Sequence, residues 1–266
     1  MDIMAKYERL LAILRERKRI AVAFSGGVDS TFLLHAAKQA LGDQVTAFTA
    51  VSVFFPRREK DEAVDFVREQ GIDQVIVDFA PLREEGVAEN PKNRCYLCKR
   101  ALFGRLQKMA QERGIDTVAE GSNLDDLGDY RPGLRAIEEL GILSPLREAG
   151  LTKGEIRELS HRLGLLTWDK PSFACLASRF VYGETITEEK LHMVDAAESL
   201  LLELGFGQFR VRIHGRMARI EVPEQQLDLM LQPKVRKRVA CQLHALGFSY
   251  VSLDLDGYRT GSMNLI

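Results

Sequence analysis

One short stretch near the N-terminus constrains the fold more than any other. It begins with the apolar run "RIAVAF" (19–24), continues as "SGGVDS" (25–30), and leads into "TFLLHAAKQALG". Continuous apolar runs are typical of buried parallel strands, and glycines directly after such a run allow a tight turn into a helix. The stretch therefore predicts a strand–loop–helix unit, with Asp29 or Ser30 capping the helix and Gly42 ending it.

The same alternation continues for most of the chain. Further β-rich runs follow, namely "QVTAFTAVS", "DQVIVDF" and "DTVAEGS", and they are separated by helix-like stretches such as "RREKDEAVDFVREQG" and "CYLCKRALFGRLQKMAQERG". Strands that alternate with helices predict βαβ units, in which helices cover both faces of a parallel sheet. We expect an α/β domain of this kind over residues 1–168.

A different order of elements follows this domain. Residues 187–266 show the patterns of a helix, two strands, a helix and a last strand, which predicts a smaller α+β domain. Between the two, residues 169–186 are rich in loop-forming residues and contain Cys175. Because ligands often bind where two domains meet, this junction is a candidate for the active site.

Composition argues against several classes of protein. The 266 residues carry a net charge of −1, whereas a protein that grips nucleic acid usually has a basic excess. No apolar run approaches the roughly 18 residues of a membrane span. The four cysteines give no disulfide framework, which is typical of a reducing compartment. We expect a cytoplasmic protein with neither nucleic acid nor membrane as partner.

The glycine-containing loop has the chemistry of a phosphate site. Gly26 and Gly27 let the backbone approach a ligand, the helix start offers free N–H groups, and Ser25, Ser30 and Thr31 add hydroxyls. Neither G-x-x-x-x-G-K-[ST] nor G-x-G-x-x-G is present. Two glycines alone would fit an ordinary tight turn. The complete "SGGVDS" string resembles the PP-loop of the ATP pyrophosphatase superfamily, whose fold is adenine nucleotide alpha-hydrolase-like.

That resemblance implies an enzyme that binds ATP, releases pyrophosphate and activates a substrate as its adenylate. Asp29 and Asp126 are candidate ligands of Mg²⁺ on the pyrophosphate, although either could instead cap a helix or loop. Loops that follow parallel strands are frequent ligand sites. The candidate nucleotide-binding residues are Ser25, Gly26, Gly27, Val28, Asp29, Ser30, Ser52, Gly121, Ser122 and Asn123.

Strings further along the chain are more specific. They are "NRCYLCKRALF", "EGSNLDDLGDYRPGLRA", "KPSFACLASR", "FRVRIHG" with "ARIEV", and "LDGYRTGSMN". In this order they resemble the LarE family, the ATP-dependent sacrificial sulfur transferases of nickel-pincer nucleotide biosynthesis. The resemblance implies a pyridinium-3,5-dicarboxylate mononucleotide as substrate. It also implies a protein cysteine that gives up its sulfur and becomes dehydroalanine, and a homo-oligomer such as a hexamer.

Cys175 matches the family's sacrificial position. Arg179, four residues on, is a candidate catalytic residue because a nearby cation favours the thiolate. Some members carry cluster-binding cysteines beside the sacrificial one, but here Phe180 and Val181 follow Arg179. We therefore expect ATP and Mg²⁺ as cofactors and no iron–sulfur cluster. The alternative for Cys175 is a buried, inert cysteine between Phe173 and Leu176.

A predicted strand supplies candidate substrate-binding residues. In "FRVRIHG", Arg210, Arg212 and His214 alternate with apolar residues and so share one face. The resemblance assigns them, with Ser178, to the substrate, and two arginines on one face can hold a phosphate. The alternative is a solvated polar face.

The other cysteines are less informative. Cys95 and Cys98 form a C-x-x-C at a helix start with no second pair for zinc, which favours a structural role or a place near the substrate. Cys241, close to two leucines in a helix, is expected in the core. Two other functions stay open: a PP-loop tRNA thiolase, disfavoured by the lack of a basic surface, and an adenine-nucleotide-binding regulator without catalysis.

Overall fold

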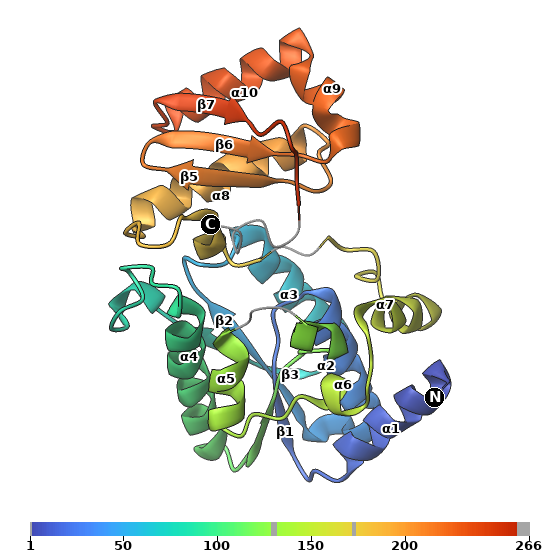
Figure 1. Ribbon diagram of the computed structural model, residues 1–266. Coiled ribbons are helices and arrows are strands. Elements are labelled where there is room, and N and C mark those ends of the chain that lie inside the picture. The colour runs from blue at the N-terminus through green and yellow to red at the C-terminus, as the bar shows by residue number, and fades with distance from the viewer. Residues whose placement is uncertain (1, 129–131, 172–173, 260–266) are drawn as a thin grey trace. The chain divides into compact units, whose positions relative to one another are not determined.

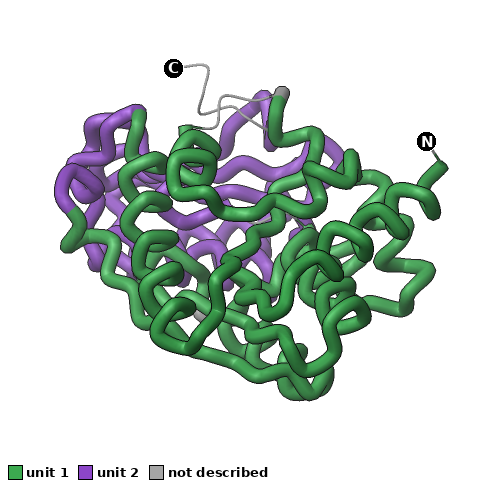
Figure 2. Tube along the Cα trace, turned by 90° about the horizontal axis from the view of Figure 1, so that it is seen from below, with its two compact units in different colours: residues 1–84, 93–173 green, residues 85–92, 174–266 purple. Residues whose placement is uncertain are grey.

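A computed structural model describes residues 2–128, 132–171 and 174–259. Parts of three family-like strings, at 129–131, 172–173 and 260–264, lie outside the described residues. The chain forms two compact units (Figure 2). Unit 1 comprises 1–84 and 93–173, and unit 2 comprises 85–92 and 174–266. Nothing in the sequence had indicated that 85–92 belongs with the second unit.

Unit 1 is built on a sheet of four parallel strands in the order β3, β2, β1, β4 (Figure 1). The predicted parallel α/β architecture is therefore confirmed. The strands are β1 (Ile20–Ala23), β2 (Val45–Val51), β3 (Asp73–Asp78) and β4 (Thr117–Ala119). The helices are α1 (Ile3–Arg15), α2 (Val28–Leu41), α3 (Arg57–Glu69), α4 (Arg94–Gln111), α5 (Pro132–Glu139), α6 (Pro145–Glu148) and α7 (Lys153–Arg162), with 3-10 turns η1 (Gly42–Gln44), η2 (Pro81–Arg83) and η3 (Leu124–Gly128).

Helices cover both faces of this sheet. Ile20 and Val22 of β1 pack in one core with α1, α2 and α7, while Ala21 packs in a second core with α4 and α5. Successive strand residues point to opposite faces, so a strand buried on both sides must be apolar at every position. That requirement explains the unbroken apolar run of "IAVA". Figure 1 shows α1 and α2 on one side of the sheet and α4 and α5 on the other.

The strand order predicts a ligand-binding crevice at the carboxyl end of β1. The chain passes from β1 to β2 on one side, and later returns to place β4 on the other side of β1. Loops leaving neighbouring strands in opposite directions open a crevice at their carboxyl ends. The segments after β1 and after β4 therefore border the same crevice.

The start of α2 differs from the prediction. Gly27 is the residue before the helix, and no side chain caps it. Asp29 and Ser30 already lie inside the first turn, and the Ser30 hydroxyl donates to the Gly27 carbonyl. The predicted capping by Asp29 or Ser30 was therefore wrong. The predicted end is confirmed, because Gly42 follows the helix with a φ of 57°.

Unit 2 is a small α+β unit, as predicted. Its sheet has the order β5 (Arg210–His214), β6 (Met217–Glu221), β7 (Tyr250–Leu253), with β5 antiparallel and β7 parallel to β6. The other elements are η4 (Leu176–Arg179), α8 (Glu188–Glu203), η5 (Glu224–Gln226), α9 (Leu227–Leu231) and α10 (Pro233–Ala245).

Cys241 is exposed, so its predicted place in the core was wrong. The buried residues of α10 are Val239 and Leu243. Cys241 lies two residues from each, and two residues are about 200° of helix rotation. It therefore points away from the buried face.

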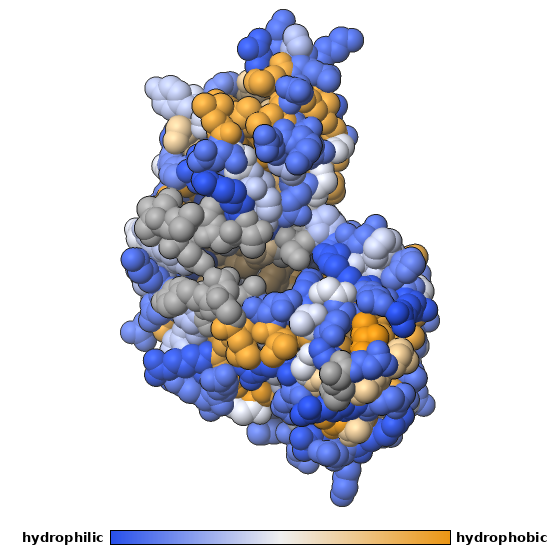
Figure 3. Space-filling model, turned by 45° about the vertical axis from the view of Figure 1, so that its right-hand side comes forward, coloured by the Kyte–Doolittle hydropathy of each residue, from blue (hydrophilic) through white to orange (hydrophobic). Residues whose placement is uncertain are grey.

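The surface seen in Figure 3 is mostly hydrophilic. Blue dominates the face of each unit shown in Figure 3, with smaller hydrophobic groups between. None of the described helices is both long enough and apolar enough to cross a membrane.

A buried ion pair organises the centre of unit 2. The guanidinium of Arg179 donates twice to the carboxylate of Glu198, at 2.9 and 2.7 Å, and both side chains are buried. Glu198 also accepts the backbone N–H of Val211 at 3.0 Å. One carboxylate thus joins η4, α8 and β5. Such a pair is costly to break because the remaining charge stays in a medium of low polarity.

Glu198→Gln should therefore destabilise unit 2. We expect a loss of about 3–5 kcal/mol in the free energy of unfolding, since Arg179 would lose the carboxylate that accepts two hydrogen bonds from its buried guanidinium. Glu203→Gln is the matched control on the same helix, because its pair with Arg238 is exposed and should contribute at most about 1 kcal/mol. Urea unfolding followed by circular dichroism measures both. Equal losses would contradict this account of the pair.

Candidate active site

A cavity of about 670 Å³ opens at the carboxyl edge of the sheet in unit 1. Segments far apart in sequence form its wall: the loop after β1, the end of β2, the face of α4 and the loop after β4. Among its lining residues are Ser25, Gly27, Asp29, Ser30, Ser52, Gly121, Ser122 and Asp126. Most of the predicted nucleotide-binding residues thus border one space.

The loop after β1 forms a compact cradle. Gly26 has a φ of 73°, a conformation that other residues rarely adopt. The Ser25 backbone N–H donates to the Ser30 hydroxyl at 3.3 Å, and the two serine hydroxyl oxygens lie 3.2 Å apart. The Thr31 hydroxyl is buried and has no hydrogen-bond partner among the described residues. Free N–H groups at the start of α2 add a positive end suited to phosphate.

An apolar section of the same cavity suits a flat base. Phe48 of β2 and Leu102, Phe103 and Leu106 of α4 line it. Ser52 also lines it, and its hydroxyl accepts the Phe54 backbone N–H at 3.2 Å. Apolar walls with few polar groups are typical of nucleotide pockets. Val28, predicted beside the nucleotide, points its side chain into the core.

Asn123 links the two loops that border the cavity. Its side-chain amide donates to Asp29 at 3.3 Å, and its backbone N–H donates to Asp126 at 3.0 Å. Asp29 also receives the ammonium of Lys153. Sequence reasoning missed Lys153, because the capping box of Thr152 and Glu155 makes it look like an ordinary helix-start residue. The contact between residues 29 and 153 arises only in the folded chain.

Glu120, directly after β4, was also missed. Its buried carboxylate lines the cavity and accepts hydrogen bonds from the hydroxyls of Ser122 and Ser144, both at 2.7 Å. These bonds hold the loop after β4 against the segment before α6. Gly121 fits between Glu120 and Ser122, where a methyl group would lie 3.1 Å from the backbone nitrogen of Ser30. The two loops therefore touch at Gly121.

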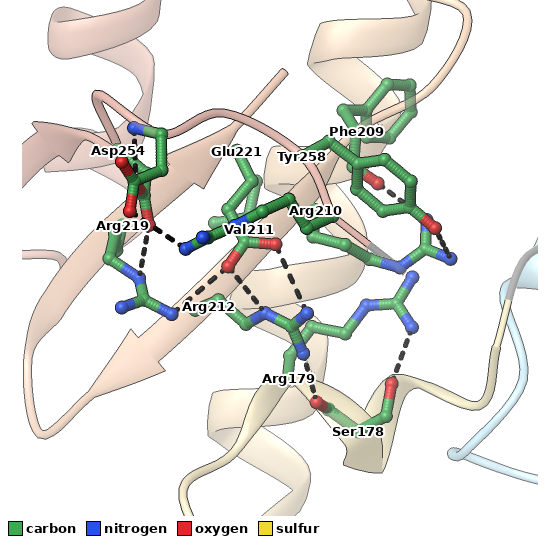
Figure 4. Close-up of polar contacts among 12 residues, drawn as sticks. Ser178, Arg179, Phe209, Arg210, Val211, Arg212, Arg219, Glu221, Asp254 and Tyr258 are labelled. Carbon is green, nitrogen blue, oxygen red and sulfur yellow. Dashed lines mark hydrogen bonds and ion pairs between the residues drawn. The ribbon is translucent and has the colours of Figure 1, made fainter. Parts of the chain in front are cut away.

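Cys175 lies in unit 2, half-buried, directly before η4. Arg179 donates to the backbone carbonyls of Ala174 and Cys175, at 2.6 and 3.1 Å, and to the Ser178 hydroxyl at 2.9 Å. Figure 4 shows the Arg179–Ser178 contact beside the arginines of β5. The guanidinium of Arg179, which is held by Glu198, thus fixes the backbone at Cys175.

A second cavity, of about 210 Å³, lies within unit 2 and is strongly cationic. It is lined by Lys92, Arg179, Val181, Tyr182, Arg212, His214 and Arg219. Arg212 donates to both oxygens of Glu221 and to the Ser178 carbonyl (Figure 4). Arg219 also contacts Glu221. One buried carboxylate therefore holds two guanidinium groups beside the cavity.

His214 contributes an unsatisfied nitrogen. Its Nε2 is buried and has no hydrogen-bond partner in the described part of the chain. Burial lowers the pKa of His214, and the charge of Arg219 lowers it further. An anion in this cavity would accept a hydrogen bond from the imidazole and offset the surrounding positive charge.

Arg210 takes a different position from Arg212 and His214. It is buried, its guanidinium lies 5.1 Å from the centroid of the Tyr258 ring, and it donates to the Phe209 carbonyl at 2.6 Å (Figure 4). Burial lowers the pKa of Arg210, and the nearby charge of Arg179 adds to the effect. Both predicted arginines of β5 are buried, so the alternative of a solvated face is wrong. Lys92 was missed because it stands outside the family-like strings, and Arg219 was missed although it lies in "ARIEV", because that string was not examined for cations.

Comparison with known proteins defines the class first. Residues 1–130 match the model of a PP-loop domain family. Together with the cavity at the start of α2, the match makes this chain an ATP-dependent enzyme of the PP-loop class.

Three relatives define it more narrowly. The chain is 42% identical to an uncharacterized protein of Synechocystis sp., over 98% of both chains. It is 40% identical to the pyridinium-3,5-bisthiocarboxylic acid mononucleotide synthase of Lactiplantibacillus plantarum, over 98% of this chain and 95% of that one. A GMP synthase of Limosilactobacillus reuteri is 27% identical over 70% of this chain and 39% of its own length. The chain belongs to the LarE family, to which that mononucleotide synthase belongs.

The close approach at Gly121 yields a first prediction for the site. Gly121→Ala should push the loop after β4 away from the start of α2, at a cost of about 1–3 kcal/mol in the free energy of unfolding, and weaken ATP binding. Gly104→Ala is the control, because nothing lies within 4 Å of the added methyl group. Isothermal calorimetry with ATP compares them. Equal ATP affinity in the two variants would contradict the contact.

The environment of His214 yields a pH prediction. Because its folded pKa lies below the unfolded value of about 6.5, the folded chain binds fewer protons and stability falls as the pH drops below that value. His214→Gln should remove this part of the pH dependence, while His192→Gln, at an exposed position of α8, should not. Urea unfolding between pH 8 and pH 5 measures the difference. A His214→Gln effect that stays constant with pH would contradict the prediction.

Proposed function

We propose that this enzyme uses ATP to activate a carboxylate of pyridinium-3,5-dicarboxylate mononucleotide and then gives it the sulfur of Cys175, in nickel-pincer nucleotide biosynthesis. The observation that carries the proposal is the 40% identity to the mononucleotide synthase over 98% of the chain. It is supported by the position of Cys175 in a string that resembles the family's sacrificial site. It is also supported by the ATP-sized cavity in unit 1.

In the first step a carboxylate oxygen of the substrate attacks the α-phosphorus of ATP. The bond from that phosphorus to the bridging oxygen breaks, pyrophosphate leaves, and an acyl adenylate forms. Ser25, Gly27 and Ser30 surround the start of α2, where N–H groups and hydroxyls would bind the departing pyrophosphate. Gly26 and Asn123 complete the cradle in this proposal, together with the backbone of Val28.

Asp29 and Asp126 are the residues that would hold Mg²⁺. They line the same cavity and are joined through Asn123. One or two carboxylates with substrate phosphates form a usual magnesium site, so the residues present fit this ion. When bound, it would offset the negative charge of the pyrophosphate.

In the second step the Cys175 thiolate attacks the acyl carbon. AMP leaves and a thioester joins the substrate to the protein. A base then removes the Cα proton of residue 175, the Cβ–S bond breaks, and the electron pair of that bond leaves with the sulfur. The products are a thiocarboxylate and dehydroalanine.

The geometry gives Arg179 a specific part in this elimination. Its guanidinium donates to the carbonyl oxygen of Cys175 at 3.1 Å. Removing the adjacent Cα proton moves negative charge onto that oxygen, and a fixed cation there stabilises it. The predicted effect of Arg179 on the thiolate of Cys175 stays a prediction beside this role.

The cationic cavity of unit 2 is the proposed site for the phosphate of the mononucleotide. Arg212, His214 and Ser178 would bind it, helped by Arg219 and Lys92. The support is the positive lining together with the His214 Nε2, which has no hydrogen-bond partner among the described residues. Arg210 stays a predicted substrate residue, acting here from its position against Tyr258.

Other features stay predictions. We expect a homo-oligomer such as a hexamer, no iron–sulfur cluster at Cys175, and no nucleic-acid partner. A cytoplasmic location would keep Cys175, which forms no disulfide with another described cysteine, in the reduced state that the reaction consumes.

Intact-mass spectrometry tests the proposal. After incubation with ATP, Mg²⁺ and pyridinium-3,5-dicarboxylate mononucleotide, the chain should lose the elements of hydrogen sulfide, and peptide mapping should place the loss at residue 175. Cys175→Ala should still release pyrophosphate but transfer no sulfur. Cys241→Ala, at an exposed cysteine, should react normally. An unchanged mass together with sulfur found in added tRNA would favour a tRNA thiolase instead.

A further inference from the structure

Lys99 interrupts an apolar stripe on α4. The residues of this helix that line the unit 1 cavity are Lys99, Leu102, Phe103 and Leu106. Their spacing of three, one and three residues places them on one face. Three of the four are apolar and suit a base. The fourth is a lysine, and a charge at such a position requires a reason because burying it costs free energy.

The side chain of Lys99 is held in place by α5. A methyl group added at Gly133 would lie 2.7 Å from Cδ of Lys99 and 3.3 Å from its Cε. Only a glycine leaves room for the lysine stem to run along α5 at this point. The methylene groups are thus packed between helices while the residue lines the cavity, the usual way in which a long cationic side chain presents its charge.

The charge of Lys99 is not used within the described protein. Among the residues the structure describes, no carboxylate pairs with it. Three carboxylates of the cavity wall have other donors: Asp29 receives Lys153, Glu120 receives Ser122 and Ser144, and Asp126 receives the Asn123 backbone N–H. Lys60, the other cation of the lining, is exposed. The half-buried positive charge of Lys99 is therefore available to a ligand in the cavity.

The order of residues along α4 indicates which part of the ligand Lys99 contacts. The apolar section ends at Leu102 and Phe103, and Lys99 lies one turn nearer the start of α4. Helices of βαβ units start at the carboxyl edge of the sheet, the edge where Ser25 to Ser30 would hold pyrophosphate. The group of ATP between its base and its pyrophosphate is the ribose with the α-phosphate.

We propose that Lys99 binds the α-phosphate of ATP and stabilises it during adenylate formation. The ammonium stays protonated and donates to a non-bridging oxygen of the α-phosphate while the carboxylate attacks and pyrophosphate leaves. Unlike the phosphate loop, which holds the leaving group, Lys99 would hold the group that is transferred. The catalytic part of this inference rests on the proposed function, whereas the binding part depends only on use of ATP.

Measurements of nucleotide affinity test the binding part of the inference separately from the catalytic part. For Lys99→Met, calorimetry should show AMP affinity about 10- to 100-fold weaker than wild type, as expected for loss of a charge-assisted hydrogen bond, with adenosine affinity unchanged. Lys108→Met, at an exposed position of the same helix, is the matched control and should bind both as wild type does. Gly133→Ala, which displaces the lysine stem without changing charge, should weaken AMP binding less. Lys99→Arg should restore part of it.

The results distinguish failure of this inference from failure of the proposed function. Equal AMP affinity in Lys99→Met and Lys108→Met would overturn the inference, and so would a loss seen with ATP but not with AMP. If wild type releases no pyrophosphate with the pyridinium substrate, the proposed function fails while the AMP result still decides the role of Lys99. With an active wild type, Lys99→Met should lower the rate of pyrophosphate release at saturating ATP. Thermal unfolding of each variant verifies that it is folded.

Discussion

The burial of β1 between β2 and β4 is the constraint on which the ATP site depends. Ile20, Ala21 and Val22 of β1 are buried on the two faces of the sheet, so "IAVA" has no polar side chain before the strand reaches the cavity at Ala23. The first polar side chain after this apolar run is that of Ser25, just past the end of the strand, so polar contacts with a ligand start there. Because β2 and β4 lie on opposite sides of β1, the loops at that end diverge and leave a crevice. The glycines after β1 and Gly121 after β4 then let the two loops approach.

A different constraint applies to unit 2, in which several positive charges lie close together inside a small protein unit. The buried Glu198 holds Arg179, and the buried Glu221 holds Arg212, by paired hydrogen bonds, and Glu221 also accepts one hydrogen bond from Arg219. These pairs reduce the desolvation cost of the guanidinium groups and fix their directions. Lys92, Arg212 and Arg219 still line one cavity. An anionic ligand bound there would offset their positive charge. Arg179 belongs to the same network and also holds the backbone of Cys175.

The sequence predicts those features that depend on neighbouring residues. The apolar run and "SGGVDS" predict β1, its loop and α2, and the alternation of patterns predicts both units. Features that depend on distant contacts were missed. Lys153 meets Asp29 across 124 positions, residues 85–92 join unit 2, and Lys99 looks like an ordinary surface lysine until α5 is placed beside it. Cys241 was misjudged because two nearby leucines suggested burial, although only one helix face is buried. The role proposed for Cys175 comes from the resemblance of its string to the family's sacrificial site.

Isotope labelling tests the central claim, that the transferred sulfur belongs to the protein itself. The protein is produced with ³⁴S-labelled cysteine and mixed with ATP, Mg²⁺, pyridinium-3,5-dicarboxylate mononucleotide and unlabelled sulfide. The thiocarboxylate product is then analysed by mass spectrometry. This account predicts product that carries ³⁴S, formed in an amount that does not exceed the amount of chain. Product containing unlabelled sulfur, or formed in repeated turnovers with Cys175 intact, would contradict it.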